Sequence, residues 1–199
     1  QSPLARSLHI VKHFQARRFA GTYADLLADP VFAPSARFFL EELYSAQDYS
    51  ARDAQFARIA GAIERTFPDS VVATVLALAK LHRQTEELDM AMAEQICNEK
   101  YNCETMSYLG AWRKTGQRSL RLWQLGTVLE IGQALGRYTR KPGLRIMLKM
   151  MRRPADLAGM GSLQRFLESG FDHFAGMARK SAAVEAFLGT IRERETAWI

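Results

Sequence analysis

The chain has 199 residues, of which 48% are hydrophobic and 24% charged, a composition that excludes a disordered protein. A chain of this length can bury most of its apolar surface in one core, so the sequence predicts one domain over residues 1–199. No stretch approaches the roughly 20 consecutive apolar residues of a membrane-spanning helix, so no membrane span is expected.

The two cysteines, Cys97 and Cys103, are too few for a disulfide framework and lack the spacing of a zinc site. Their scarcity favours a reducing, cytoplasmic setting. The sequence starts with Gln1 rather than an initiator Met, and the start lacks the apolar core of a signal peptide. We therefore expect it to begin inside a longer chain.

Helical periodicity extends through nearly the whole sequence, whereas the alternation and tight-turn dipeptides of strands are absent. The first predicted helix covers residues 4–26 and stops at Pro30. Pro34 disfavours an immediate restart, so Ser35 is predicted to cap the next, short helix.

The longest predicted helix runs from Ser70 to about Asn98 and lies at the centre of the chain. It is preceded by a helix that Ser50 is predicted to cap, with Asp53 in its first turn, and that runs to Pro68. Five further helices are predicted after it. The first carries Met106 to Trp112, the second runs from Gln117 to about Thr139, and the third runs from Leu144 to Arg153, followed by a short helical piece at Pro154. Ser162 is predicted to cap the fourth, and the fifth starts at about Ser181. The fold prediction is therefore a compact, bundle-like, all-α domain of about eight helices with a long central helix.

Three blocks carry a resemblance to a known family. Residues 38–56 read FFLEELYSAQDYSARDAQF, residues 81–89 read LHRQTEELD, and residues 154–171 read PADLAGMGSLQRFLESGF. They resemble a family of uncharacterised bacterial helical proteins whose blocks read FFLxxLYxxxDxxxRDxxF, LxxxTExLD and PAxxAGxxxLQxFLExGF. The resemblance implies a helical fold and brings no activity with it.

The central helix carries the first candidate site. Helical spacing places His82, Thr85 and Asp89 along one side, with Glu86 one turn after His82. A histidine near two carboxylates is typical of an axial ligand, a metal ligand or a general base. The alternative is that His82 is hydrogen-bonded to a neighbouring helix, while Thr85 and Asp89 satisfy buried backbone or Trp groups. No second histidine stands at ligand spacing, so no metal site is predicted.

The second candidate site is a basic segment. Residues 1–104 hold 11 Lys and Arg against 14 Asp and Glu, whereas residues 105–199 hold 16 against 7. Residues 137–153 contain seven basic residues and no acidic one. The expected patch consists of Arg145, Lys149, Arg152 and Arg153, opposite an apolar side formed by Leu144, Met147, Leu148 and Met151. A basic amphipathic helix binds an acidic protein or an anionic surface, unless its charges are simply solvated.

Signatures of catalysis are weak. The sequence lacks the Gly-x-Ser-x-Gly elbow of hydrolases and a glycine-rich phosphate loop, and it does not fit a helix-turn-helix, so no specific DNA binding is expected. Gly132 and Gly136 are predicted to allow close helix packing. The functional prediction is a non-catalytic regulatory or protein-interaction domain. The alternative is a binder of a small hydrophobic ligand or a tetrapyrrole in an interhelical pocket, with His82 as a contact.

Overall fold

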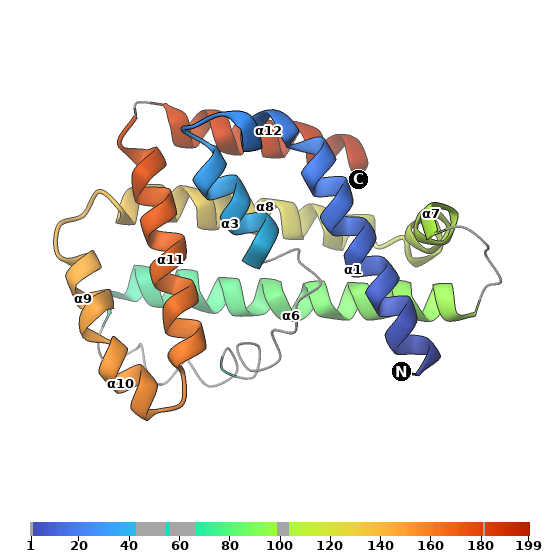
Figure 1. The fold of residues 1–199 in the computed structure, drawn as a ribbon, viewed down its shortest axis with the longest axis horizontal. Helices are drawn as coiled ribbons and strands as arrows, with labels where there is room; N and C mark the ends of the chain where they lie inside the picture. The colour runs from blue at the N-terminus through green and yellow to red at the C-terminus, as the bar shows by residue number, and fades with distance from the viewer. Residues whose placement is uncertain (1, 43–54, 56–66, 99–103, 181) are drawn as a thin grey trace.

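The structure is a computed structural model that describes residues 2–42, 55, 67–98, 104–180 and 182–199 (Figure 1). These residues form helices, eight of which have seven or more residues, and they include no strand. The prediction of an all-α fold with a long central helix is confirmed. No helix within these ranges is long and apolar enough to cross a bilayer.

The helices follow one another in this order: α1 (Pro3–Thr22), α2 (Ala24–Ala28), α3 (Ala33–Glu42), α6 (Asp69–Cys97), α7 (Glu104–Thr115), α8 (Arg118–Tyr138), α9 (Leu144–Met150), α10 (Arg152–Leu157), α11 (Gly161–Ala178) and α12 (Ala183–Trp198). Helices α6, α8 and α12 run side by side, with α8 between the other two (Figure 1). Helices α1, α3 and α11 cross them steeply on one face, while α7 lies at one end of the molecule and α9 and α10 lie at the other.

The long helix α6 begins directly after Pro68, whose fixed φ of −57° leads into the first turn, and Asp69 adds a favourable negative charge there. The buried face of α6 includes Leu81, Leu88 and Met92. Full burial of such a side chain contributes about 1.5–3 kcal/mol. The predicted bounds of this helix are confirmed to within one residue.

The N-terminal prediction is wrong in two details. The helix expected over residues 4–26 is interrupted at Tyr23, whose φ of −114° and ψ of 24° separate α1 from α2. Helix α3 begins at Ala33, ahead of the predicted cap at Ser35, because a proline is tolerated in the first turn. The Ser35 hydroxyl instead donates to the carbonyl of His173 on α11 at 3.2 Å.

The C-terminal prediction also changes. The basic helix expected over residues 144–153 ends at Met150, and α10 starts afresh at Arg152, with Pro154 in its first turn as predicted. Met160, rather than the predicted Ser162, is the cap of α11. The predicted helix from Ser50 to Pro68 lies almost wholly outside the described residues.

Helix α8 approaches α12 closely through two glycines. A Cβ atom placed on Gly132 would come within 2.6 Å of a Leu188 methyl group, and one on Gly136 within 3.0 Å of Val184. Leu188 and Val184 are both buried in the core, next to Phe187. The prediction that the two glycines permit close packing is therefore confirmed.

Candidate functional site

The side chains of the first candidate site hold neighbouring helices together. Thr85 accepts a hydrogen bond from Gln124 on α8 (Nε2–Oγ1 2.8 Å) and donates one to the Leu81 carbonyl. Both carboxylate oxygens of Glu86 accept from the Lys12 ammonium group on α1, at 2.8 and 3.0 Å. His82 lies half-buried on the same helix.

Asp89 is the buried member of this group, with 4% of its surface exposed. Its Oδ1 accepts a hydrogen bond from Gln15 Nε2 of α1 at 2.8 Å. Burial raises the pKa of this carboxyl to about 6, and the nearby Glu86 charge acts in the same direction. The Gln15 hydrogen bond and the charges of Lys12 and Arg121 oppose that rise in pKa.

Two further buried polar groups lie near Asp89, and the sequence analysis missed both. The guanidinium of Arg121 stacks 3.4 Å from the ring centroid of Trp112 and donates to the Gly116 carbonyl. Burial lowers its pKa. The Tyr108 hydroxyl is buried without a hydrogen-bond partner among the described residues, and burial raises its pKa to about 12. In the sequence, Arg121 stands among the apolar residues of α8, and this position was the signal that could have indicated a buried cation.

The polar side chains of this first cluster make contacts between helices. The hydrogen bonds of Thr85, Glu86 and Asp89 join α6 to α1 and α8. The described residues contain no group of three or more potential metal ligands. The side chains of Thr85, Glu86 and Asp89 thus make contacts to neighbouring helices.

The four basic residues of the second candidate site divide into two pairs. Arg145 forms a two-pronged ion pair with Asp172 on α11, and Arg152 forms another with Glu168. The hydrogen bonds from Arg152 hold the pKa of the Glu168 carboxyl below its usual value. Lys149 and Arg153 are exposed.

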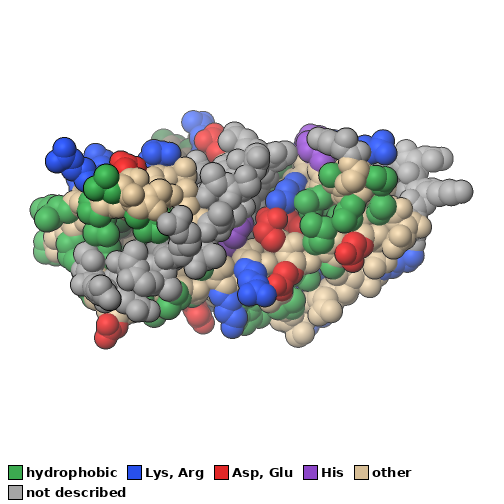
Figure 2. All heavy atoms as spheres, turned by 90° about the horizontal axis from the view of Figure 1, so that it is seen from below, with side chains coloured by type: hydrophobic (Ala, Val, Ile, Leu, Met, Phe, Trp, Pro, Cys, Tyr) green, Lys and Arg blue, Asp and Glu red, His purple; other side chains and the backbone are tan. Residues whose placement is uncertain are grey.

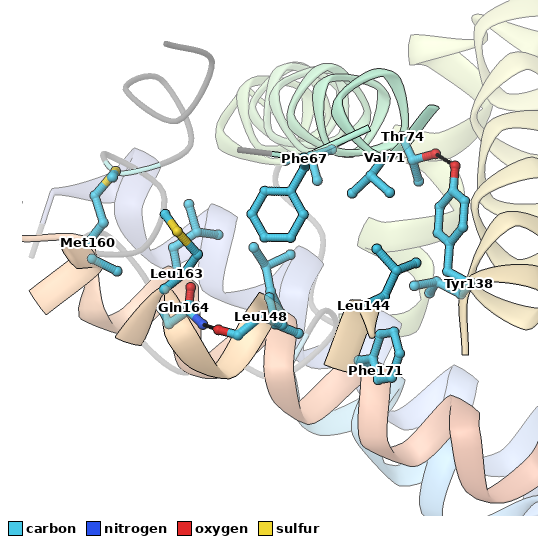
Figure 3. A pocket seen from close by; sticks show the side chains of 15 residues that line it. Phe67, Val71, Thr74, Tyr138, Leu144, Leu148, Met160, Leu163, Gln164 and Phe171 are labelled. Atoms are coloured by element: carbon cyan, nitrogen blue, oxygen red, sulfur yellow. Dashed lines mark hydrogen bonds between the residues drawn. The ribbon is translucent and has the colours of Figure 1, made fainter. Parts of the chain in front are cut away.

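The apolar side of the basic segment faces inward. It forms one wall of a partly open pocket between α6, α8, α9, α10 and α11 (Figure 3). The pocket has a volume of ≈ 110 Å³. The side chains that bound it are mostly large and apolar, among them Phe67, Val71, Leu144, Leu148, Leu163 and Phe171.

Polar groups in the wall of the pocket are hydrogen-bonded to the protein itself. The Tyr138 hydroxyl donates to the Ser70 carbonyl at 2.6 Å and lies 3.0 Å from Thr74 Oγ1. Gln164 Nε2 donates to the Leu148 carbonyl at 2.6 Å and to Glu168 at 2.9 Å. The pocket therefore presents an almost entirely apolar surface to a ligand.

The sequence could not locate this pocket, because its walls come from residues between 67 and 171 and most of them belong to ordinary apolar stripes. An apolar stripe has the same spacing whether it faces a filled core or a void. His82 does not belong to the lining of this pocket.

The chain was compared with protein families, with curated proteins and with solved structures. The model of a family described as "Domain of unknown function (DUF8198)" matches residues 1–199. No curated protein matches the sequence, and no solved structure matches the chain.

Proposed function

The chain belongs to this family of unknown function, and we propose that it is a non-catalytic helical domain that binds a small apolar molecule in the pocket between α6, α8, α9, α10 and α11. The observation that carries the proposal is the apolar lining of that pocket, whose few polar atoms are hydrogen-bonded to the protein.

The size of the pocket supports an occupant. Protein interiors are close-packed and contain few voids larger than a water molecule. A pocket of ≈ 110 Å³ is several times that size and approaches the engineered cavity of about 150 Å³ that stays dry and binds benzene. Side chains that border an empty apolar space lose dispersion contacts, and a hydrocarbon of matching shape would restore them.

The chemistry of the lining defines the class of ligand. An apolar hydrocarbon, such as an aromatic ring or a short aliphatic chain, leaves no polar group unsatisfied against Leu148, Leu163 and Phe171. Pockets for drug-sized molecules occupy about 300–1,000 Å³, so a tetrapyrrole is far too large for this one. The geometry therefore supports the hydrophobic-ligand alternative and does not involve His82.

The same lining supports a non-catalytic role. Tyr138 is the one titratable side chain among the described residues that line the pocket, and its hydroxyl is engaged by Ser70 and Thr74. Asp89, whose pKa is strongly raised, lies with Gln15 of α1 in the other cluster. Among the described residues that line the pocket, no free general acid or base faces a bound molecule.

Benzene and cyclohexane are suitable probes, and two methionines in the pocket wall report on them. In ¹³C-methyl spectra of methionine-labelled protein, we expect the Met151 and Met160 signals to shift with saturating benzene. The signal of Met92, which is buried on α6 in a core cluster with residues of α7, should stay unchanged. A ligand at about 100 times its Kd stabilises the folded state by about 2.7 kcal/mol. For a chain of this size, this raises the Tm by roughly 5–10 °C.

The matched control uses two buried alanines. Ala155→Leu fills the pocket and is expected to abolish both the methyl shifts and the rise in Tm. Ala36→Leu makes the same change in a second, smaller pocket of ≈ 60 Å³ and should leave the Met151 and Met160 responses intact. Unshifted Met151 and Met160 signals in the unmodified protein, or a response that survives in Ala155→Leu, would refute the proposal.

A further inference from the structure

The outer face of α9 and α10 exposes large apolar side chains. Ile146 is 63% exposed, Met150 72% and Leu157 91%, whereas the other exposed large hydrophobic side chains of the described chain reach at most 39%. Isolated surface hydrophobics are common, but three on two consecutive short helices form a cluster. Clusters of this kind mark interaction surfaces.

Cations surround this cluster. Lys149 and Arg153 are exposed on the same two helices, and Arg140 and Lys141 are exposed in the connection that precedes α9. The segment over residues 137–153 contains no acidic residue, whereas the exposed Asp156 adds one negative charge next to Leu157 on α10. An anionic partner would therefore find positive charge and apolar surface together.

The fold fixes the orientation of this face. Leu144, Leu148 and Met151 lie on the pocket side of the same segment. The ion pairs of Arg145 and Arg152 with α11 hold the two helices in place. As a result, Ile146, Met150 and Leu157 cannot turn inward without breaking those contacts.

This face also lies at one end of the molecule. Figure 1 shows α9 and α10 on the outer side of α11, away from α7 and α1. Hydrophobic and basic side chains gather at the same end in the space-filling view (Figure 2).

We propose that the surface formed by Ile146, Lys149, Met150, Arg153 and Leu157 binds an anionic phospholipid bilayer. The three apolar side chains enter the boundary between headgroups and acyl chains, and the cations contact the lipid phosphates. We favour a bilayer over an acidic protein as the partner, because the three apolar side chains are exposed and the acyl-chain region of a bilayer can bury them. The proposal uses the outer side chains alone and stands apart from any ligand in the pocket.

The test is co-sedimentation of the full chain with vesicles of phosphatidylcholine alone and of equimolar phosphatidylcholine and phosphatidylglycerol. We expect binding to the anionic vesicles that weakens as salt is added. The double variant Lys149→Gln/Arg153→Gln should lower the partition constant about 30-fold, because each basic residue near an anionic surface contributes about fivefold. Arg113→Gln/Arg118→Gln removes two exposed charges around the α7–α8 connection and should leave binding unchanged.

The apolar contribution is tested separately. Met150→Ser/Leu157→Ser should lower binding to the anionic vesicles at least tenfold, because the variant no longer buries these two apolar side chains in the bilayer. Leu76→Ser/Met90→Ser changes exposed apolar residues on α6 and serves as the control. Circular dichroism verifies that each variant is folded.

Three results overturn the proposal. The first is absence of binding by the unmodified protein, which would leave an acidic protein as the partner of this surface. The second is equal binding by the Lys149/Arg153 and Arg113/Arg118 variants. The third is full binding by the Met150/Leu157 variant, which would reduce the interaction to non-specific attraction between a basic protein and an anionic surface.

Discussion

The Asp89 carboxyl lies where α1 packs against α6, with Gln15 as its hydrogen-bond donor. Burial raises its pKa from 3.8 to about 6. The folded protein therefore binds a proton more tightly than the unfolded chain between these two pH values. The stability that this proton confers is present in full below about pH 4 and is lost as the pH rises through 6.

The variant Asp89→Asn removes the buried charge and keeps an oxygen that accepts from Gln15. We expect the free energy of unfolding at neutral pH to exceed that of the unmodified protein by about 3 kcal/mol, because the cost of burying the anion disappears. The difference should shrink as the pH falls toward 4. Denaturant unfolding at several pH values measures it.

The control for this variant is Glu87→Gln, which removes an exposed carboxylate from the same helix, where it pairs with Arg83. Its effect should stay within about 0.5 kcal/mol at every pH. A constant difference between Asp89→Asn and the unmodified protein across the pH range would contradict a raised pKa for Asp89.

At the scale of helices, contact between α8 and α12 depends on the absence of a side chain. The built Cβ of Gly132 lies 2.6 Å from a methyl group of Leu188, which is itself 3% exposed and surrounded by core residues. Gly126 lies on the same helix, and a Cβ atom there meets nothing within 4 Å. Substitution of Gly132 therefore tests close packing together with helix propensity, whereas substitution of Gly126 tests helix propensity alone.

Gly132→Ala should lower the free energy of unfolding by about 1–2 kcal/mol, because overpacking outweighs the gain in helix propensity. Gly126→Ala should raise it by about 0.5–1 kcal/mol through propensity alone. Thermal and urea unfolding measure both. In a Leu188→Ala background, where the clash is removed, the Gly132→Ala penalty should vanish; a penalty that persists there would place its cause elsewhere.

Much of the helical pattern was predictable, since the cues are local. The bounds of α6 followed from the apolar periodicity after Pro68. The cap at Ser35 was wrong because its hydroxyl contacts the carbonyl of His173, a residue of another helix. Helix ends thus depend partly on tertiary contacts that a reading of the sequence does not contain.

At the scale of the whole molecule, the two ends of the chain are joined through Glu195 of α12. Both carboxylate oxygens accept from the Arg18 guanidinium of α1 at 2.9 and 3.0 Å, and Oε1 also accepts from the Tyr23 hydroxyl at 2.7 Å. The Arg18 and Glu195 side chains are 9% and 14% exposed. Breaking a buried pair leaves its other charge without compensation.

Glu195→Gln should lower the free energy of unfolding by about 2–3 kcal/mol, whereas Glu193→Gln, at an exposed position on the same helix, should change it little. We also expect hydrogen exchange to speed up together in α1, α6 and α12, because residues 1–199 are predicted to be one cooperative unit. Faster exchange confined to α12 would contradict a single domain.

The sequence by itself determined the all-helical class, the long central helix and the concentration of cations over residues 137–153, because periodicity, prolines and composition act over a few neighbouring residues. Tertiary structure alone decided that Arg145 and Arg152 pair with α11 while Lys149 and Arg153 stay exposed. It also decided that Asp89 is buried and that a pocket lies behind α9 and α10. Burial, ion pairing and voids arise from contacts between residues far apart in the chain, and no local pattern encodes them.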